Sequence, residues 1–286
     1  NGGVLPMITS CSPGWIKFIE HNFPELLPNL STCKSPHQML GAIIKSYYAK
    51  TAGIDPKNIF TVSVMPCVAK KAEAARPEFS RDGDPDVNIS ITTRELAHMI
   101  RFANMDFALL EEDDFDRPLG ESTGAGVIFG ATGGVIEAAV RTAYEVQTKK
   151  PLDRIDFTEL RGMEGVRSAT VDFDGTPVRI GIAHGLANAR QLIREVVNGT
   201  SPYHAIEIMA CPGGCIGGGG NPPKTWSIME KRKKAIYEAE AELPVRQSHK
   251  NPAIQKIYET YLGEPCGELS HKLLHTEYCN RQDLLQ

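Results

Sequence analysis

The chain has 286 residues, of which 41% are hydrophobic and 23% charged, and its formal net charge is -4. This composition excludes a basic nucleic-acid-binding surface and a cationic membrane-binding face. No stretch reaches the ~20 consecutive apolar residues of a transmembrane helix. The length fits one large domain or two closely packed lobes. Because the sequence starts at Asn1 without a signal-like or transit-like segment, we expect an N-terminally truncated fragment of a cytoplasmic protein.

The first third of the sequence alternates between helical and strand patterns. Pro36 suits the first turn of a helix, and the β-branched run at 59–64 is typical of a buried strand. Thr93 and Glu95 indicate a capping box at a helix start. We predict helices at 15–23, 35–52, 70–76 and 93–102, and strands at 59–64 and 87–91.

The remainder continues this alternation after an acidic loop at 111–118 and a glycine-rich stretch at 120–134. Asp174-Gly175 predicts the turn of a hairpin. We predict helices at 135–147 and 186–197, strands at 166–173, 178–183 and 205–209, and a polar helical tail from Met229. The predicted fold is α/β, with two lobes of twisted, mainly parallel sheet flanked by helices. The approximate lobes are 1–120 and 121–286, and we expect a metal site in the cleft between them.

The seven cysteines do not form the pattern of a disulfide-rich protein, because they are sparse and odd in number. A reducing compartment and several metal-binding thiols fit better. Cys33, Cys266 and Cys279 lie outside any motif, and we expect them to be small buried apolar residues.

Three cysteine motifs carry the chemical signal. The segment ACPGGCIGGGG places Cys211 and Cys215 after a predicted strand and among glycines, which let backbone approach a bulky ligand. The segment MPCVAKKAE places Cys67 between a strand and a helix, with Lys70 nearby. In TSCSPGW, Cys11 taken alone could be a nucleophile, a ligand or a turn residue.

The glycine loop TGAGVIFGATGG does not favour nucleotide binding. Gly124 and Gly126 start a G-x-G pattern, but Phe129 stands where the third glycine of the dinucleotide fingerprint belongs. No Gly-Lys-Ser/Thr follows, which argues against a P-loop.

The three cysteine motifs, in this order, resemble the signature segments of the iron–iron hydrogenases. The family patterns are TSCCPxW, MPCxxKxxE and ExMACxxGCxxGGGQP, and the chain has TSCSPGW, MPCVAKKAE and EIMACPGGCIGGGGNP. The glycine loop and the tail segments SHKNPAIQKIYETYLGEP and HKLLH also resemble the family. The resemblance covers essentially the whole chain.

The resemblance implies a [4Fe-4S] cluster joined to a two-iron subsite that carries CO, cyanide and azadithiolate ligands. It makes Cys67, Cys211 and Cys215 cluster ligands, with Cys215 as the thiolate that bridges to the two-iron subsite. It also implies that the Lys70 ammonium pairs with a cyanide ligand. The residues implied to surround the two-iron subsite or line its cavity are Met65, Met209, Phe129, Pro66, Pro36, His37, Gly124, Ala125 and Gly130.

The chain departs from the family in its first motif, where Cys11-Ser12 stands in place of two cysteines. The ungapped match puts Cys11 at the proton-relay position and Ser12 at the fourth cluster ligand. A serine oxygen is a harder donor than a thiolate and binds iron less readily. Three arrangements are open: Ser12 binds iron, Cys11 binds in its place, or one cluster corner is open or takes an outside ligand.

The resemblance further implies reversible H2 oxidation and proton reduction, with Ser31 on the proton path. Implied partners are an electron carrier such as ferredoxin, electron-relay domains or a nicotinamide-linked subunit, and maturation proteins that insert the two-iron subsite. The usual glutamates of the proton path would lie upstream of Asn1. The alternative functions are a non-catalytic iron–sulfur protein of cluster assembly and an H2-sensing relative.

Overall fold

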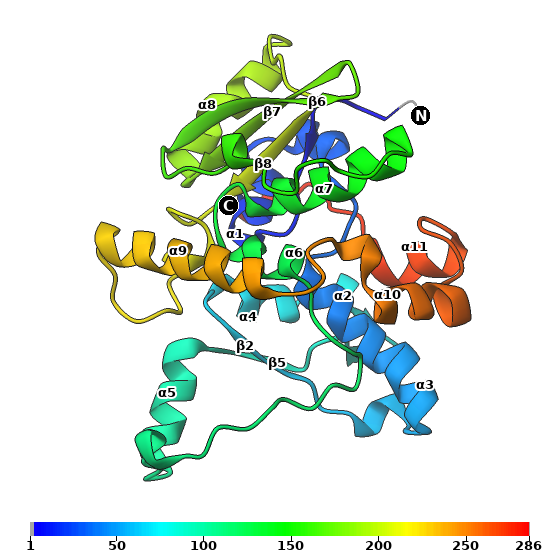
Figure 1. The fold of residues 1–286 in the computed structure, drawn as a ribbon, viewed down its shortest axis with the longest axis vertical. Helices are drawn as coiled ribbons and strands as arrows, with labels where there is room; N and C mark the ends of the chain where they lie inside the picture. The colour runs from blue at the N-terminus through cyan, green and yellow to red at the C-terminus, as the bar shows by residue number, and fades with distance from the viewer. Residues whose placement is uncertain (1–2, 286) are drawn as a thin grey trace.

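The computed structural model describes residues 3–285 and contains one larger sheet, a separate pair of parallel strands and a short antiparallel pair, β3 (Ser80–Arg81) and β4 (Asp84–Pro85) (Figure 1). The larger sheet has the order β1-β8-β7-β6, and its strands span Met7–Ile8, Ala205–Met209, Thr176–His184 and Val166–Phe173. β8 pairs in parallel with both β1 and β7, whereas β6 and β7 form an antiparallel hairpin. The predicted α/β class is confirmed, and the sheet is mixed.

The hairpin turns at Asp174-Gly175, as the sequence predicts. Both residues have positive φ angles, of 55° and 90°. An Asp-Gly pair tolerates this left-handed backbone, which matches the twist of the two flanking strands. The turn sets a register in which Phe173 faces Thr176 and Val166 faces Ala183.

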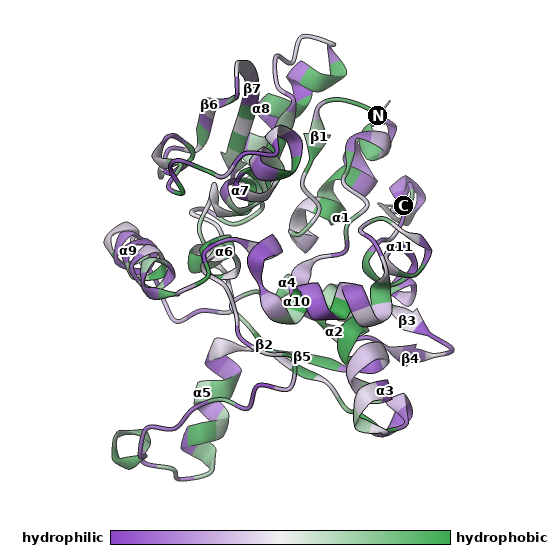
Figure 2. Cartoon of the chain, turned by 45° about the vertical axis from the view of Figure 1, so that its right-hand side comes forward, coloured by the Kyte–Doolittle hydropathy of each residue, from purple (hydrophilic) through white to green (hydrophobic). Residues whose placement is uncertain are grey.

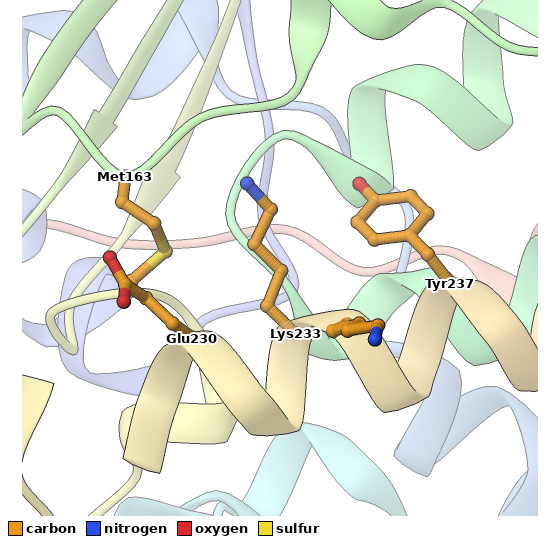
Figure 3. Close-up of a pocket in the computed structure, with 5 residues that line it drawn as sticks. Met163, Glu230, Lys233 and Tyr237 are labelled. Carbon is orange, nitrogen blue, oxygen red and sulfur yellow. The ribbon is translucent and has the colours of Figure 1, made fainter. Parts of the chain in front are cut away.

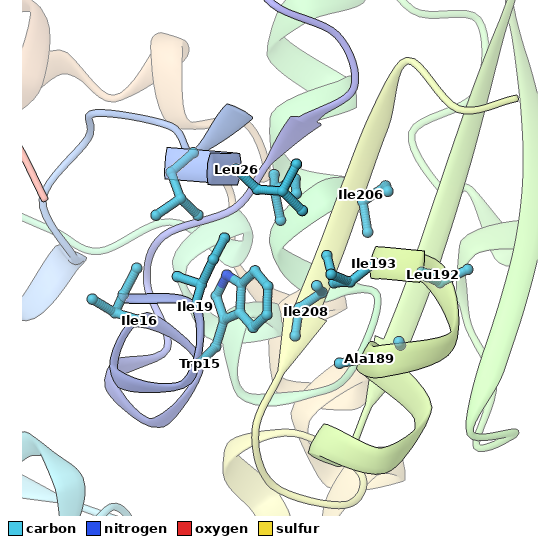
Figure 4. Close-up of a cluster of buried hydrophobic side chains, with 12 residues drawn as sticks. Trp15, Ile16, Ile19, Leu26, Ala189, Leu192, Ile193, Ile206 and Ile208 are labelled. Carbon is cyan, nitrogen blue, oxygen red and sulfur yellow. The ribbon is translucent and has the colours of Figure 1, made fainter. Parts of the chain in front are cut away.

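Helices cover both faces of the larger sheet. On one face, α1 (Pro13–Asn22) and α8 (Leu186–Val197) enclose a core in which Trp15 and Ile19 pack near Ile206 and Ile208 (Figure 4). On the other face, α7 (Gly134–Thr148) packs Ile136 against the strands. Burying these side chains stabilises the sheet by removing apolar surface from water. The predicted lobe boundary near residue 120 stays a prediction, and it would separate β1 and α1 from the sheet against which they pack.

The second sheet consists of β2 (Val62–Met65) and β5 (Ile89–Thr92), which run parallel. β2 starts later than predicted, and the expectation that it is buried is wrong. Val62 and Val64 are 51% and 45% exposed.

The helix α5 (Thr93–Phe102) follows β5 and has no buried residue. Its cap is Thr92, one residue before the predicted one, because the Glu95 amide donates to the Thr92 hydroxyl while the Glu95 carboxylate accepts from the Thr92 amide. α5 and the turn after it carry hydrophobic segments on the surface (Figure 2), including Phe102 and Leu109.

The helix predicted at 35–52 is one continuous helix built from three parts. It contains α2 (Pro36–Ile43), a π-helical turn (Ile44–Tyr48) and α3 (Ala49–Ala52), and the Ser35 side chain caps its first turn. The other helices are α4 (Ala69–Ala74), α6 (Gly124–Val127), α9 (Trp226–Glu242), α10 (Pro252–Ile257) and α11 (Glu268–Leu274). Within residues 3–285 the structure shows no helix long and apolar enough to cross a membrane.

A buried ionic cluster joins α7 to α9, which crosses the middle of the molecule (Figure 1). The fully buried Arg141 donates to Glu137 at 2.8 Å and to Glu240 at 2.7 Å. Arg161 and Arg246 bind the same two carboxylates at 2.6 Å. Asp156 lies 2.6 Å from Arg161 and 2.7 Å from Arg246. These six residues, called the Arg141 cluster below, contain three arginines and three carboxylates, so their charges balance.

Candidate functional site

Three loops that are distant in sequence meet just beyond the ends of β1, β2 and β8. The loop after β1 carries Cys11, the loop after β2 carries Cys67, and the loop after β8 carries Cys211 and Cys215. Ligands collect at such strand ends in α/β proteins. Together with Ser12, these residues are called the cysteine site below.

The glycines of the third motif allow this meeting. A Cβ atom at Gly218 would lie 2.0 Å from the Pro66 carbonyl oxygen, and one at Gly220 would lie 2.8 Å from the Pro66 carbonyl carbon. The Gly220 amide donates to the same Pro66 oxygen at 2.9 Å. Any larger side chain would therefore push the third motif away from the Cys67 loop.

The first motif packs against the third in the same way. A Cβ atom at Gly14 would lie 2.9 Å from the Ala210 Cβ. The Trp15 indole donates to the Thr9 carbonyl oxygen at 3.0 Å, which fixes the loop that carries Cys11 and Ser12. The local sequence thus folds into a rigid turn against β8.

Cys67, Cys211 and Cys215 lie close enough to influence one another electrostatically. Burial raises the pKa of Cys215, the Lys70 charge lowers it, and the neighbouring Cys67 and Cys211 thiols raise it, which together gives a pKa of about 11. Burial and Cys67 also raise the pKa of Cys211, against the effect of a hydrogen bond from the Gly219 amide. Backbone amides of this kind bind the sulfurs of iron–sulfur clusters.

Cys11 and Ser12 face different parts of the site. Burial raises the pKa of Cys11 to about 12, although the Lys70 charge lowers it, and the other titratable groups that affect its thiol are Glu207, Cys215 and Glu73. The Ser12 hydroxyl oxygen instead accepts a hydrogen bond at 3.2 Å from the Ala210 amide, directly before Cys211. Cys11 is therefore near Cys215 and Lys70, and Ser12 is on the side of Cys211.

Lys70 points its ammonium toward the cysteine site. Its Nζ donates to the Cys11 carbonyl oxygen at 3.3 Å and to both oxygens of Glu73, at 3.0 and 2.8 Å. His37 lies behind Glu73, with Nδ1 2.9 Å from the carboxylate and Nε2 2.7 Å from the Ser63 hydroxyl. Its predicted place in the cavity lining stays a prediction.

The two methionines lie at the strand ends beside the cysteine loops. Met209 ends β8 and is buried, and Met65 ends β2 and is partly buried. Pro66 supports the site through its carbonyl, which accepts from Gly220. Pro36 opens α2 directly before His37.

The glycine loop residues contact α9. A Cβ atom at Gly124 would lie 2.8 Å from the Glu240 carbonyl oxygen, and one at Gly130 would lie 2.8 Å from the side chain of Ile236. Ala125 is fully buried, and Phe129 packs in the same apolar cluster. These four positions thus have packing contacts, and their role as cofactor-binding residues stays a prediction.

Ser31 is tied to the first motif through the backbone. Its amide donates to the Ile8 carbonyl, and its hydroxyl accepts from the Cys33 amide at 3.3 Å. The Cys33 carbonyl in turn accepts from the Ser10 hydroxyl at 2.6 Å. Ser31 is therefore two hydrogen bonds from the residue before Cys11.

The cysteines outside the motifs differ from expectation. Cys266 and Cys279 are exposed, so the prediction that they are buried is wrong, and Cys33 is partly buried. All seven cysteines are free thiols. Cys266 has a φ angle of 60°, which places it in a turn and not in the apolar core.

A small pocket beside the cysteine site has different chemistry. It has a volume of about 280 Å³ and is lined by Met163, Glu230, Lys233, Lys234 and Tyr237 (Figure 3). Burial and the nearby Arg167 lower the pKa of Lys233. Because no cysteine lines it, this pocket is not the place of an iron–sulfur cluster.

The cysteine site fits an iron–sulfur cluster in its donor chemistry. Soft thiolates from three cysteines, an adjacent hydroxyl and a backbone amide such as that of Gly219 are groups that bind such clusters. Within residues 3–285 no three His, Cys, Asp or Glu side chains converge as around a single metal ion. A cluster takes one ligand per iron, so its ligands stand further apart than those of one ion.

Two buried carboxylates received no role from the sequence. Glu207 on β8 accepts from the Gly133 amide at 2.6 Å and the Ile136 amide at 2.9 Å, which fixes the start of α7 to the sheet. Glu73 holds Lys70. Both glutamates are fixed positions of the motifs quoted above, Glu73 in the second and Glu207 in the third. These motif positions are the feature of the sequence from which a role for the two residues could have been predicted.

Comparison with known families supports this geometry. Residues 1–219 match a family described as the iron only hydrogenase large subunit, C-terminal domain, and residues 227–281 match one described as the iron hydrogenase small subunit. The first match covers most of the chain. The chain belongs to the iron-only hydrogenase family.

Individual relatives support the same family. The chain is 55% identical over 282 residues to the NADP-reducing hydrogenase subunit HndD of Solidesulfovibrio fructosivorans, which covers 98% of the chain and 48% of the relative. A solved structure of a variant of the [FeFe]-hydrogenase HydA1 from Chlamydomonas reinhardtii matches with a TM-score of 0.83 and 42% identity, over 96% of the chain and 76% of HydA1. The hydrogenase chain thus spans about half the length of HndD.

A more distant relative has another name. Protein NAR1 of Arabidopsis thaliana is 33% identical over 295 residues, covering 96% of the chain and 61% of the relative. The chain is therefore also similar in sequence to a protein that is not named a hydrogenase.

Proposed function

We propose that the protein containing this chain is an iron–iron hydrogenase that reversibly oxidises H2 and reduces protons. The observation that carries the proposal is the Lys70 ammonium, which is ion-paired with Glu73 and lies 3.3 Å from the carbonyl oxygen of Cys11, a cysteine additional to the trio of Cys67, Cys211 and Cys215. A site for a cluster alone requires the trio, but it does not require a further, partly buried cysteine and a buried ammonium beside it.

We assign Cys67, Cys211 and Cys215 as ligands of a [4Fe-4S] cluster and Ser12 as the residue at its fourth corner. When bound, the cluster and a two-iron subsite with CO, cyanide and azadithiolate ligands supply the electrons and the metal centre for hydrogen chemistry. Support for Ser12 comes from its hydroxyl, which lies against the Ala210 amide beside Cys211. Cys11 is then free to act as the proton relay.

The chain's own contribution is to move protons and exclude water. The Cys11 thiol stays protonated at neutral pH because burial raises its pKa to about 12. Lys70 places a positive charge at the same end of the site, and we propose that it pairs with a cyanide ligand. Ser31 is proposed to continue the proton path.

We also propose that electrons arrive from ferredoxin, relay domains or a nicotinamide-linked subunit. Maturation proteins would insert the two-iron subsite. The small-subunit match at 227–281 supports partner subunits in general. A cytoplasmic location is part of the same proposal, and the free state of all seven cysteines supports it.

The second candidate function is a non-catalytic protein of iron–sulfur cluster assembly, which the identity to Protein NAR1 favours. The two functions are separated by infrared spectroscopy of the matured full-length protein. The hydrogenase shows bands from CO and cyanide and evolves H2 from a reduced viologen. A protein that binds iron but has neither property contradicts our proposal. A sensor would show the bands with slow turnover.

The assignment of Ser12 and Cys11 is tested by Ser12→Cys and Cys11→Ala. We expect Cys11→Ala to keep its iron but lose turnover by at least ~100-fold, the usual contribution of a proton-transfer group. Ser12→Cys should keep both. If Cys11→Ala instead loses the cluster, Cys11 is the fourth ligand and the relay assignment is wrong. Cys279→Ala is the matched control, because this thiol is exposed and outside the site.

A further inference from the structure

The Lys70 ammonium is held in place by a buried set of side chains from three elements. Lys70 is only 8% exposed, and Glu73, which binds it from the same helix, is 5% exposed. A lysine side chain has several rotatable bonds and loses much conformational freedom when its end is fixed. Some part of the structure must therefore direct the ammonium to the Cys11 loop.

Glu73 has the geometry for this task. Each of its two carboxylate oxygens lies within 3.0 Å of the Lys70 Nζ, so the ion pair has one preferred orientation. Such charge-assisted hydrogen bonds are stronger than neutral ones. Because the same Nζ also donates to the Cys11 carbonyl oxygen, the carboxylate and the Cys11 loop hold the ammonium between them.

Glu73 is itself immobilised by the first turn of α2. The Ser35 hydroxyl donates to Oε2 at 3.0 Å, and His37 Nδ1 lies 2.9 Å from the same oxygen. The other ring nitrogen of His37 lies 2.7 Å from the Ser63 hydroxyl on β2, so the imidazole is anchored at both ends. Burial raises the pKa of Glu73, but His37 and Lys70 lower it below its ordinary value, which keeps the carboxylate charged.

We propose that Glu73, fixed by His37 and Ser35, is the positioning residue that directs the Lys70 ammonium to the Cys11 end of the cysteine site. This inference rests on the proposed function for its catalytic consequence, because Lys70 is assigned there to a cyanide ligand. It does not rest on that function for its structural content, which concerns four side chains of the chain itself.

The first test uses the protein without its two-iron subsite. Amine-directed labelling of the native full-length protein, followed by mass spectrometry, measures how accessible Lys70 is. We expect Glu73→Gln to speed the labelling of Lys70 by about tenfold, the factor that follows from losing one charge-assisted hydrogen bond. Lys71 on the same helix has an exposed ion pair with Glu95 and serves as the internal reference. Equal labelling of Lys70 in both proteins overturns the proposal.

The second test uses the matured protein and reads the cyanide bands in the infrared spectrum. Glu73→Gln should shift or broaden a cyanide band and lower H2 evolution, with iron content unchanged. Glu73→Asp, which keeps the charge, should restore part of the band position. A general structural role would not give this charge-dependent rescue. Unchanged bands in Glu73→Gln contradict the proposal.

Two further variants keep the test decisive if Glu73→Gln does not fold. His37→Gln and Ser35→Ala weaken the support of Glu73 and leave its charge, so each should increase Lys70 labelling by a smaller factor. If neither does, Glu73 does not depend on this support and the inference is wrong. If no matured form shows CO bands or H2 evolution while the labelling changes are present, the proposed function fails and the positioning role of Glu73 stands.

Discussion

The Arg141 cluster is a mostly buried group of polar side chains and the cysteine site a partly buried one, but only the first has all its partners among the chain's own residues. In the Arg141 cluster, Arg141 lies between Glu137 and Glu240, and further arginines balance the same carboxylates. In the cysteine site, burial raises the pKa of Cys11 to about 12 and of Cys215 to about 11. The thiols of the protein alone are therefore kept uncharged.

This difference in charge pairing distinguishes a structural cluster from a site that binds a metal cofactor. Burying charges costs free energy unless they are paired, and the Arg141 cluster meets that condition by itself. The cysteine site has a different composition: weakly polar thiols, glycine backbone and, beside them, the Lys70 ammonium, whose one counter-charge is Glu73. Iron supplies the positive charge that would stabilise the thiolates. We therefore expect the first region to determine stability and the second to determine metal content.

The largest expected effect is on metal binding. Cys215→Ala should abolish loading of the two-iron subsite and most cluster iron, because it removes a ligand that we propose is shared by both groups. The free energy of unfolding of the iron-free protein should change little. Iron analysis and chemical denaturation of the same preparation measure both. A variant with normal iron content would show that Cys215 is not a ligand.

The second largest expected effect is on stability and leaves metal binding unchanged. Arg141→Met leaves Glu137 and Glu240 buried with fewer counter-charges, so we expect a loss of about 3–5 kcal/mol in unfolding free energy. Any variant protein that remains folded at low temperature should still bind iron. Urea denaturation with iron analysis checks this. Loss of iron binding without loss of stability would mean that the two regions are not separate.

A smaller effect concerns pH. Burial tends to raise the pKa of Glu240, but hydrogen bonds from Arg246 and Arg141 outweigh burial and lower it below 4.5. The folded pKa lies below the unfolded one, so this stabilisation is present above pH 4.5 and is lost as pH falls through the folded pKa. Glu240→Gln should flatten the fall of stability below pH 4.5, as followed by denaturation across pH. An unchanged acid slope would remove Glu240 from the cluster's energetics.

The smallest effect comes from an ion pair on the surface. Lys71 and Glu95 lie 2.6 Å apart with side chains 42% and 48% exposed. Water screens such pairs, so Lys71→Gln should leave both melting temperature and iron content unchanged. A clear change in either quantity would show that α4 transmits its surface contacts to Lys70 and Cys67.

The sequence predicted most of the elements that carry the site. The Asp174-Gly175 turn, the helix at 186–197 and the strand at 205–209 follow local rules of turn chemistry and periodicity, and the structure has all three. The family resemblance also anticipated the order of the three motifs. These features depend on residues that are near one another in the chain.

The parts that depend on distant residues were less predictable. The β-branched run at 59–64 predicted a buried strand, but burial requires a neighbouring element, and Val62 is half exposed. The N-cap of α5 is Thr92 and not the predicted Thr93, because the Thr92 hydroxyl accepts the hydrogen bond from the Glu95 amide. The link from His37 to Glu73 joins residues that are 36 apart. No local pattern contains that contact, and so the positioning of Lys70 emerged only from the fold.

The contact of Gly218 and Gly220 with Pro66 has a consequence for the history of this domain. The glycines are required because two stretches of backbone touch, whatever chemistry takes place beside them. A descendant that kept the three-cysteine arrangement but gave up hydrogen turnover would still be unable to replace them. The glycine run is thus expected to be inherited with the architecture, whereas Cys11 and Lys70 would be free to drift once selection for turnover ended.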